Sequence, residues 1–263
     1  MRALSIMYHD VVENGDFGSS GFPGEGAHVY KLRREDFERH LAAIREAVPA
    51  AQAVSSIAAR REWSDPTPVF LTFDDGGASA LHPAADILES YGWRGHFFIT
   101  TDRIGTAGFL NTEEVRELHR RGHVIGSHSA SHPNRMAALA RDEIDREWRL
   151  SLDRLSQIAG ESLKTASVPG GYYSREVAES AAASGIEVLF TSEPTAGTTV
   201  VNGCLVLGRY AVQRGMGPEW SAGFAAGRVG PRWRQTALWK AKQIAKSLGG
   251  EAYLKLRRAI LER

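Results

Sequence analysis

Short apolar runs alternate along the chain with segments in which apolar residues recur every three or four positions. The apolar runs contain β-branched and aromatic residues, a composition typical of buried strands. They lie at residues 3–7, 69–73, 95–100, 124–126, 186–192 and 205–210. The segments with helical spacing lie between them, at residues 35–47, 84–91, 112–121, 143–159 and 175–184. Strand followed by helix, repeated, predicts an α/β fold with a parallel sheet covered by helices.

A glycine-rich stretch, residues 13–28, interrupts this alternation after the first strand. Connections of this length are usually either functional or irregular. Two interpretations stay open at this point: the stretch borders an active site as a lid, or it is a disordered surface loop.

The charge of the chain is unevenly distributed, although the net charge is only +1. Between Arg228 and Arg263, ten arginines and lysines stand against two glutamates, so this segment carries +8 and the rest of the chain −7. Residues 237–248 and 252–261 have the pattern of basic amphipathic helices. We expect residues 216–263 to form a helical tail that packs its apolar face on the rest of the protein. The alternative is docking to the inner face of an anionic membrane or to an acidic partner.

Length and composition are those of a globular protein with one main domain. The chain has 263 residues, of which 43% are hydrophobic and 24% charged, and residues 1–215 show no linker or repeat. The single cysteine, Cys204, excludes an internal disulfide and lies in an apolar run, where a buried thiol is expected. No targeting segment or membrane-spanning run is evident, so we expect a cytoplasmic location. No nucleic-acid-binding motif accompanies the basic tail, so no nucleic-acid partner is expected.

Side chains that can bind a metal follow two of the predicted strands. Asp74 and Asp75 end the run 69–73, and His128 and His132 follow the run 124–126. Two adjacent carboxylates repel each other, and a divalent cation would hold them together. One Asp and two His are typical ligands of a catalytic metal that keeps open positions for water and substrate. For the Asp pair alone, a turn that closes the strand is the alternative.

These two motifs resemble those of a known family. Residues 72–76 and 128–132 are similar to the first and second motifs of the polysaccharide deacetylases of the NodB-homology type, carbohydrate esterase family 4. The resemblance covers about residues 3–212. It implies a distorted (β/α)7 barrel over residues 1–215, followed by the basic helical extension. It also implies that Asp74 is the general base and that Asp75, His128 and His132 bind the metal.

The chain departs from the family's pattern in two places. The third motif usually carries an arginine that pairs with the catalytic Asp, but Ser167 or its neighbour stands there. The late Leu-x-His motif, whose histidine is the general acid, is absent, and Arg209 stands near the position of that histidine. We predict that Arg209 pairs with Asp74 or with a substrate anion; the alternative is a surface arginine. The resemblance to circularly permuted exopolysaccharide deacetylases, of the poly-N-acetylglucosamine type, assigns the acid to His9 instead.

The segment Pro169-Gly170-Gly171 is a further candidate. It exposes backbone N–H groups, and those near Gly171 and Tyr172 can stabilise a developing oxyanion. An ordinary tight turn is the alternative.

The predicted function is metal-dependent removal of an acetyl group from an N-acetylated sugar of a polysaccharide or glycan intermediate. Two imidazoles and a carboxylate favour Zn²⁺, although Co²⁺, Ni²⁺, Mn²⁺ and Fe²⁺ suit similar ligands. Two alternatives stay open: a non-catalytic carbohydrate-binding protein that keeps the barrel and the metal, and a hydrolase of another non-peptide C–N bond. Retention of both Asp74 and Asp75 favours an enzyme, because a binding protein needs no base.

Overall fold

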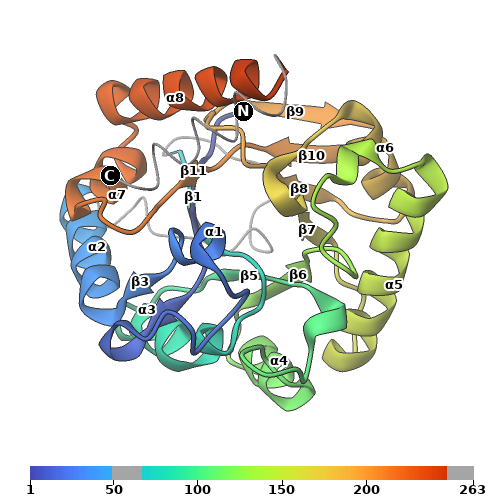
Figure 1. Ribbon diagram of the computed structural model, residues 1–263, viewed down its shortest axis with the longest axis horizontal. Helices are drawn as coiled ribbons and strands as arrows, with labels where there is room; N and C mark the ends of the chain where they lie inside the picture. Colours follow the sequence, from blue (N-terminus) through green and yellow to red (C-terminus); the bar gives the residue numbers. More distant parts are fainter. Residues whose placement is uncertain (49–66, 248–263) are drawn as a thin grey trace.

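Nine strands form one curled sheet in the part of the chain that the computed structural model describes, residues 1–48 and 67–247 (Figure 1). The strands are β1 (Leu4–Tyr8), β4 (Val69–Phe73), β5 (His96–Ile99), β6 (Val124–Ser127), β7 (Thr165–Ser167), β8 (Val188–Phe190), β9 (Thr198–Val201), β10 (Cys204–Leu207) and β11 (Tyr210–Ala211). Their order is β11-β1-β4-β5-β6-β7-β8-β10-β9, and only the β9–β10 pair is antiparallel. The carboxyl ends of the parallel strands therefore meet at one rim, where the loops that follow them lie together.

Helices cover the outer side of this sheet (Figure 1). They are α2 (Arg34–Ala47), α3 (Asp86–Ser90), α4 (Thr112–Arg120), α5 (Arg141–Ala159) and α6 (Arg175–Ala183). Helix α4 begins at the predicted cap: the Asn111 side chain accepts from the Glu114 N–H, and Glu114 accepts from the Asn111 N–H. The predicted α/β barrel architecture is confirmed, and within the described residues no strand pairing joins β9 to β11, so the barrel is distorted.

The last predicted strand, residues 205–210, breaks in two. Strand β10 pairs with β8 on one side of the break, and β11 pairs with β1 on the other. Gly208 and Arg209 form the link between them. The link runs so close to residues 193–195 that a Cβ on Gly208 would lie 2.3 Å from the carbonyl oxygen of Glu193. The prediction of one continuous strand was therefore wrong. At the break, the side chain of Arg209 points into the barrel.

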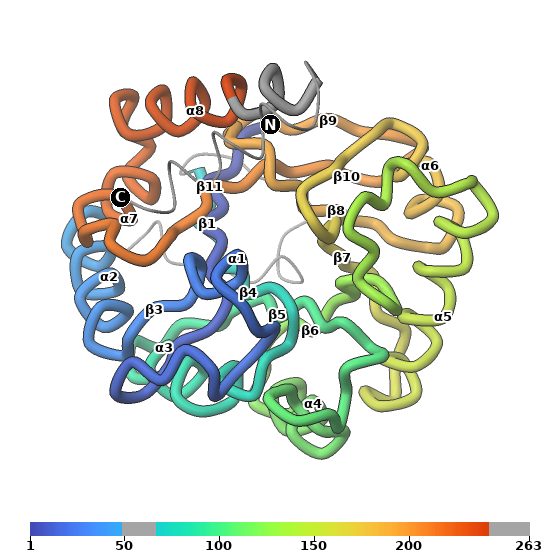
Figure 2. The backbone as a smooth tube through the Cα atoms, viewed as in Figure 1, coloured from blue at the N-terminus to red at the C-terminus, as the bar shows by residue number. Residues whose placement is uncertain are grey.

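The segment between β1 and α2 forms a small structure of its own at the rim. It contains β2 (Val11–Val12), α1 (Glu25–His28) and β3 (Leu32–Arg33), and β2 and β3 pair as a two-stranded parallel sheet. The trace in Figure 2 shows this segment lying over the β4 and β5 side of the barrel.

The tail contains α7 (Pro218–Ala225) and α8 (Val229–Ser247). Helix α7 packs on α2 and β1, where the Ser221 hydroxyl accepts from Tyr8 at 3.0 Å and lies 2.8 Å from Nδ1 of His40. The predicted start of the next helix at residue 237 was wrong. Helix α8 begins eight residues earlier, because Pro231 lies in its first turn and costs no backbone hydrogen bond there. The predicted helix at 252–261 lies outside the described residues.

Two expectations from composition can be compared with the structure. Cys204 is a buried free cysteine, as expected. Among the helices of the described ranges, none has both the length and the apolar character needed to cross a membrane.

Candidate active site

The register of the parallel strands brings the candidate residues to one part of the rim. Tyr8 of β1 pairs with Phe73 of β4, so His9 and Asp74 leave neighbouring strands side by side. The Asp74 N–H donates to the Tyr8 carbonyl at 3.2 Å, which extends the ladder to this point. Strand pairing therefore decides that a residue near the N-terminus lies next to the central carboxylates.

Asp75, His128 and His132 form a cluster that suits a divalent cation. Their ligand atoms all lie within 4.8 Å of one another. The Nε2 atoms of His128 and His132 lie 3.4 Å and 3.5 Å from the same oxygen, Oδ1 of Asp75. Asp75 and His132 have φ angles of 77° and 61°, a left-handed backbone that redirects both side chains at the strand ends. One carboxylate and two imidazoles fit a catalytic metal site with open positions.

The electrostatics of the cluster agree with metal binding. Burial, with repulsion from His128, lowers the pKa of His132 to about 4, so this imidazole is neutral at pH 7. Burial alone would raise the pKa of Asp75, but its hydrogen bond to His128 and the nearby charge of His9 outweigh burial and lower that pKa. Neutral imidazole and ionised carboxylate are the protonation states that a metal requires.

Ser167 fixes the orientation of His128. It ends β7, and the pairing of Ser127 with Ala166 places it beside His128. The Ser167 hydroxyl lies 2.5 Å from Nδ1 of His128 and donates to Oδ1 of Asp74 at 3.1 Å. Because this hydroxyl donates to the carboxylate, it accepts from Nδ1–H, and that tautomer leaves Nε2 free to bind a metal.

Glu147 of α5 holds the loop between the two histidines. Its Oε2 accepts from the N–H groups of Ala130 and Ser131 at 2.9 Å and 2.8 Å, and its Oε1 accepts from the Ser131 hydroxyl at 2.7 Å. Ser129 and His132 in this loop both have positive φ, a conformation that non-glycine residues seldom adopt. The carboxylate therefore stabilises the strained turn that brings the two imidazoles together.

Arg209 and Asp74 form a buried, two-pronged ion pair inside the barrel. Nη1 and Nη2 of Arg209 donate to Oδ1 and Oδ2 of Asp74 at 2.6 Å and 2.7 Å. The guanidinium also donates to the Thr191 carbonyl at 3.0 Å and to the Thr72 hydroxyl at 3.2 Å. Arg209 is fully buried, so the alternative of a surface arginine was wrong. Its side chain enters from the break between β10 and β11.

This pair keeps Asp74 ionised. Burial alone would raise the pKa of Asp74, but the charge of Arg209, followed by that of His128, holds the pKa well below the usual range. The two parallel N–H groups of the Arg209 guanidinium match the two oxygens of the Asp74 carboxylate. This contact fixes the plane of the carboxylate as well as its charge.

His9 lies beside both carboxylates. Its charge lowers the pKa of Asp74 and of Asp75, and its ring packs on Tyr30 with centroids 4.7 Å apart. Its Nδ1 is buried and has no hydrogen-bond partner among the described residues. A polar atom left in this state at a rim is available to a bound molecule.

The turn Pro169–Gly171 follows β7 at the same rim. Gly170 and Gly171 have φ angles of 65° and 72°, and a Cβ on Gly170 would lie 2.7 Å from the Asn134 carbonyl oxygen. The tightness of the turn therefore requires glycine at 170. The ring of Tyr172 lies under the guanidinium of Arg135, at 4.9 Å. The role of Gly171 and Tyr172 toward an oxyanion stays a prediction.

Comparison with known families gives a match over the centre of the chain. The polysaccharide deacetylase family model matches residues 62–189, a range that contains Asp74, Asp75, His128 and His132. The matched segment, residues 62–189, belongs to the polysaccharide deacetylase family. His9 and Arg209 lie outside the matched range.

Curated relatives and solved structures extend this finding. YxkH of Bacillus subtilis, whose name assigns it provisionally to the polysaccharide deacetylases, is 28% identical over 148 residues, 56% of this chain and 52% of YxkH. The curated relatives first in similarity are matched over about a third to a half of their own length. The deacetylase PplD of Streptococcus pyogenes, solved with acetate, has a TM-score of 0.65 at 21% identity and covers 83% of this chain and 96% of PplD. IcaB of Ammonifex degensii has a TM-score of 0.66 at 19% identity and covers 86% of this chain and 97% of IcaB. These structures share the fold.

Two residues that shape the site carried no signal in the sequence. Glu147 is one of several acids on the polar side of α5, and nothing in the pattern distinguishes it from the others. Ser167 was noted only as the residue that stands where the family has arginine. In the structure its hydroxyl contacts both Asp74 and His128, while the guanidinium of Arg209 binds the same Asp74 carboxylate.

Proposed function

We propose that the chain is a metal-dependent hydrolase that removes an acetyl group from an N-acetylated sugar of a glycan. One observation carries the proposal: a cluster of Asp75, His128 and His132 lies next to a second carboxylate, Asp74, that is buried and held by Arg209. A site that only bound a metal would need the cluster and not the oriented base beside it.

Asp75, His128 and His132 would hold the cation. When bound there, a divalent cation supplies Lewis-acid polarisation of the acetyl carbonyl and makes water more acidic. The mixed nitrogen and oxygen donors favour Zn²⁺, and Co²⁺, Ni²⁺, Mn²⁺ and Fe²⁺ suit the same set.

Asp74 takes the proton from the attacking water, and His9 gives a proton to the amine as acetate leaves. Arg209 keeps Asp74 ionised and fixes the plane of its carboxylate, so that this group can accept a proton from water. His9 lies beside the carboxylates on the neighbouring strand end and has an unpartnered buried Nδ1. Backbone N–H groups near Gly171 and Tyr172 would stabilise the negative charge on the acetyl oxygen.

The Arg209–Asp74 contact supports the enzyme over a non-catalytic carbohydrate-binding protein. The absence of the third-motif arginine and of the late histidine would suit such a protein. In the structure, the guanidinium of Arg209 enters from the link between β10 and β11 and pairs with Asp74, so the proposed base does not lack a partner. A binding protein would gain nothing from an aligned, ionised base in this position.

Acetate release from N-acetylglucosamine oligosaccharides by metal-loaded protein tests the proposal. The comparison is wild type against Asp74→Asn, with Asp86→Asn on the outer surface as a matched control. We expect release by wild type and the control, and a loss of at least about 100-fold in Asp74→Asn, the range of a removed general base. Metal content, measured in all three proteins, should be equal. Equal release by wild type and Asp74→Asn would contradict the assigned base, and ammonia or an amine other than a free sugar amine as product would indicate the alternative C–N hydrolase.

A further inference from the structure

Two exposed arginines flank His132 at the rim. Arg103 follows β5, and its guanidinium lies over the ring of Phe22 at 5.2 Å, while the Phe22 ring packs on His132 at 4.8 Å. Arg135 lies three residues after His132, with its guanidinium over Tyr172. Each arginine therefore lies one ring away from a candidate site residue.

Two buried charged residues, Lys31 and Asp10, hold the loop that carries Phe22 in place. The ammonium group of Lys31 donates to the carbonyls of Phe17 and Phe22, both at 2.8 Å, and also to that of Ser20. Asp10, next to His9 in the chain, accepts from the Ser20 hydroxyl at 2.6 Å. The glycine-rich stretch is thus anchored from inside, and the ring that supports Arg103 has a fixed position.

Neither rim arginine has a carboxylate partner among the described residues. Arginines on the outer helices do: Arg116 pairs with Glu113, Arg141 with Asp145 and Arg175 with Glu179. A guanidinium that stacks on a ring keeps its N–H donors free, and its planar fork matches the oxygens of a phosphate. Two such groups at the rim, one over Phe22 and one over Tyr172, provide N–H donors that suit an anion.

We propose that Arg103 and Arg135 bind a phosphate carried by the substrate, so that the substrate class is a phosphorylated N-acetyl sugar. This inference rests on the proposed function, because it names the substrate of the same site. The phosphate lies outside the metal cluster, beside the sugar that is deacetylated. The neutral sugar is bound by the same site without this contribution.

Calorimetric binding of N-acetylglucosamine 1-phosphate, N-acetylglucosamine and inorganic phosphate tests the proposal without turnover. We expect wild type to bind the sugar phosphate at least about ten-fold more tightly than either other ligand, one charge-assisted contact being worth that much. The double variant Arg103→Gln/Arg135→Gln should lose this preference. Arg45→Gln is the matched control, because Arg45 also lies over a ring, Tyr91, but on α2 at the outer wall. Any phosphate that binds at the metal contributes equally to the affinities of wild type, the double variant and Arg45→Gln, so it does not affect the comparison.

Equal affinity of wild type for the phosphorylated and neutral sugars would overturn the inference. The same conclusion would follow if the double variant kept the preference, or if inorganic phosphate bound as tightly as the sugar phosphate. None of these results touches acetate release from neutral oligosaccharides, so a failure here is separable from a failure of the proposed function.

A second surface, on α8, carries an independent inference. Helix α8 lies along the outer edge of the barrel, beside α7 (Figure 1). Val229 and Trp233 on this helix are 77% and 71% exposed, and Leu238 is 56% exposed. Exposed positions recur at 229, 233, 237 and 241, which is one face of a helix. An exposed tryptophan with aliphatic neighbours on one helix face indicates an interaction surface.

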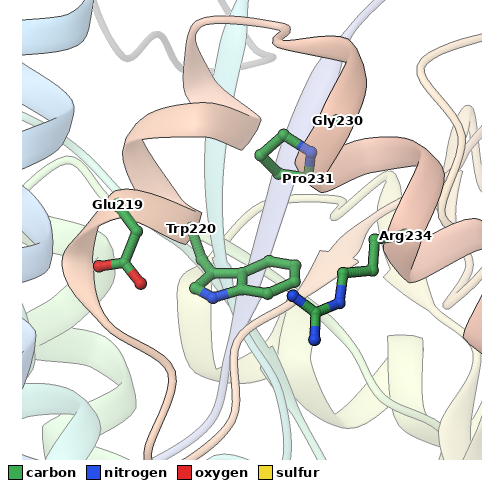
Figure 3. Close-up of a pocket in the computed structure, with 5 residues that line it drawn as sticks. All are labelled: Glu219, Trp220, Gly230, Pro231 and Arg234. Carbon is green, nitrogen blue, oxygen red and sulfur yellow. The ribbon is translucent and has the colours of Figure 1, made fainter.

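The charge of α8 selects one kind of partner. Val229–Ser247 contains five arginines and lysines and no acidic residue. Beside the exposed face, α7 and α8 enclose a hollow of about 350 Å³ lined by Trp220, Pro231 and Arg234 together with Glu219 and Gly230. Figure 3 shows the Arg234 guanidinium beside the Trp220 indole, 5.2 Å from the ring centre. Aromatic and aliphatic side chains among cations suit the interface of an anionic lipid bilayer.

The geometry points to this face of α8 as a docking surface for anionic membrane lipid. Trp233 and Val229 enter the headgroup region, and Arg234 and Lys240 lie against the lipid phosphates. Binding of this kind combines apolar burial with attraction to surface charge and weakens as salt screens the charge.

Co-sedimentation of the full chain with phosphatidylcholine vesicles, with and without phosphatidylglycerol, tests this surface. We expect binding only to vesicles with phosphatidylglycerol, a decrease with added salt, and about ten-fold weaker binding in Trp233→Ser and in Arg234→Gln. The matched controls are Leu150→Ser, an exposed leucine on α5, and Arg154→Gln on the same helix. Binding to neutral vesicles alone, or unchanged binding in Trp233→Ser, would refute the inference. A dimer in light scattering that Trp233→Ser dissociates would assign the face to a second copy of the chain instead.

Discussion

Replacing Arg209 by methionine tests the ion pair on which the site is built. Methionine is unbranched and of similar length, so it fills most of the space and removes only the charge and the donors. The Asp74 carboxylate would lose both prongs of the fork, and Thr191 and Thr72 would each lose a donor. The carboxylate stays buried, because the strands that cover it do not depend on the guanidinium alone.

The expected cost is large because one charge of a buried pair is left alone. Breaking such a pair by removing one partner typically costs about 3–5 kcal/mol. A typical domain unfolds with about 5–15 kcal/mol in total, so the variant should fold but with much of its stability lost. A surface pair gives the comparison: Arg34 contacts Glu13 and Glu38 but is nearly half exposed, and Arg34→Met should cost at most about 1 kcal/mol.

The contribution of Asp74 to the free energy of unfolding should change with pH in opposite directions in wild type and in Arg209→Met. In wild type the folded pKa of Asp74 is depressed, so its stabilising contribution is present above the unfolded pKa and is lost as pH falls through the folded pKa. In Arg209→Met, burial is opposed only by the nearby charges of His128 and His9, and the pKa of Asp74 should move above its usual value. Its contribution then turns against folding as pH rises through that raised pKa. The stability difference between the proteins should therefore be largest near neutral pH and shrink toward acid.

Urea unfolding at neutral and mildly acidic pH measures this difference, and the pH profile of acetate release gives a second readout. We expect the acid limb of the profile to move to higher pH in Arg209→Met, because the base is protonated there. A surface ion pair is worth at most about 1 kcal/mol. The reasoning is refuted if the free energies of unfolding of Arg209→Met and wild type differ by no more than this at neutral pH. It is equally refuted if the stability difference grows toward acid.

Three further substitutions test the site, and a labelling experiment tests the buried cysteine. His9→Ala should lower kcat by about 10²–10⁴, the contribution of a general acid, with metal content unchanged in elemental analysis. Ser167→Ala removes the group that orients His128 and should weaken metal affinity by about 10–100-fold, measured by competition with a chelator. Glu147→Gln leaves one acceptor for three donors of the histidine loop and should weaken metal affinity in the same assay by a similar factor of about 10–100. Burial raises the pKa of Cys204 to about 12, so iodoacetamide should label it in urea and not in the folded protein.

Each of these outcomes has a contrary result that counts against its reasoning. Unchanged turnover in His9→Ala would show that His9 is not the general acid. Wild-type metal affinity in Ser167→Ala or Glu147→Gln would show that the histidines are positioned without them. Rapid labelling of folded protein would show that Cys204 is not sealed by β10 and its neighbours.

The sequence by itself determined the type and order of the elements and the metal cluster. Short apolar runs rich in β-branched and aromatic residues predict the strands, and segments with a period of 3.6 residues predict the helices between them. Each half of the candidate metal cluster was local: Asp74 and Asp75 are adjacent, and His128 and His132 are four apart, each pair following a strand. Residues close in sequence need no knowledge of the rest of the fold to be placed together.

Only the tertiary structure decided which distant residues complete the site. Arg209 lies 135 positions from Asp74, and the contact exists because the last strand breaks at Gly208 and the chain crosses from β10 to β11. His9 lies beside Asp74 because β1 pairs with β4 in one register, and a shift by one residue would point it to the opposite face. Glu147 and Lys31 act through backbone groups of loops, whose shape no residue pattern records. Local periodicity is a property of the chain, whereas register, strand breaks and loop anchoring depend on how separate segments pack, and these fix where the chemistry can occur.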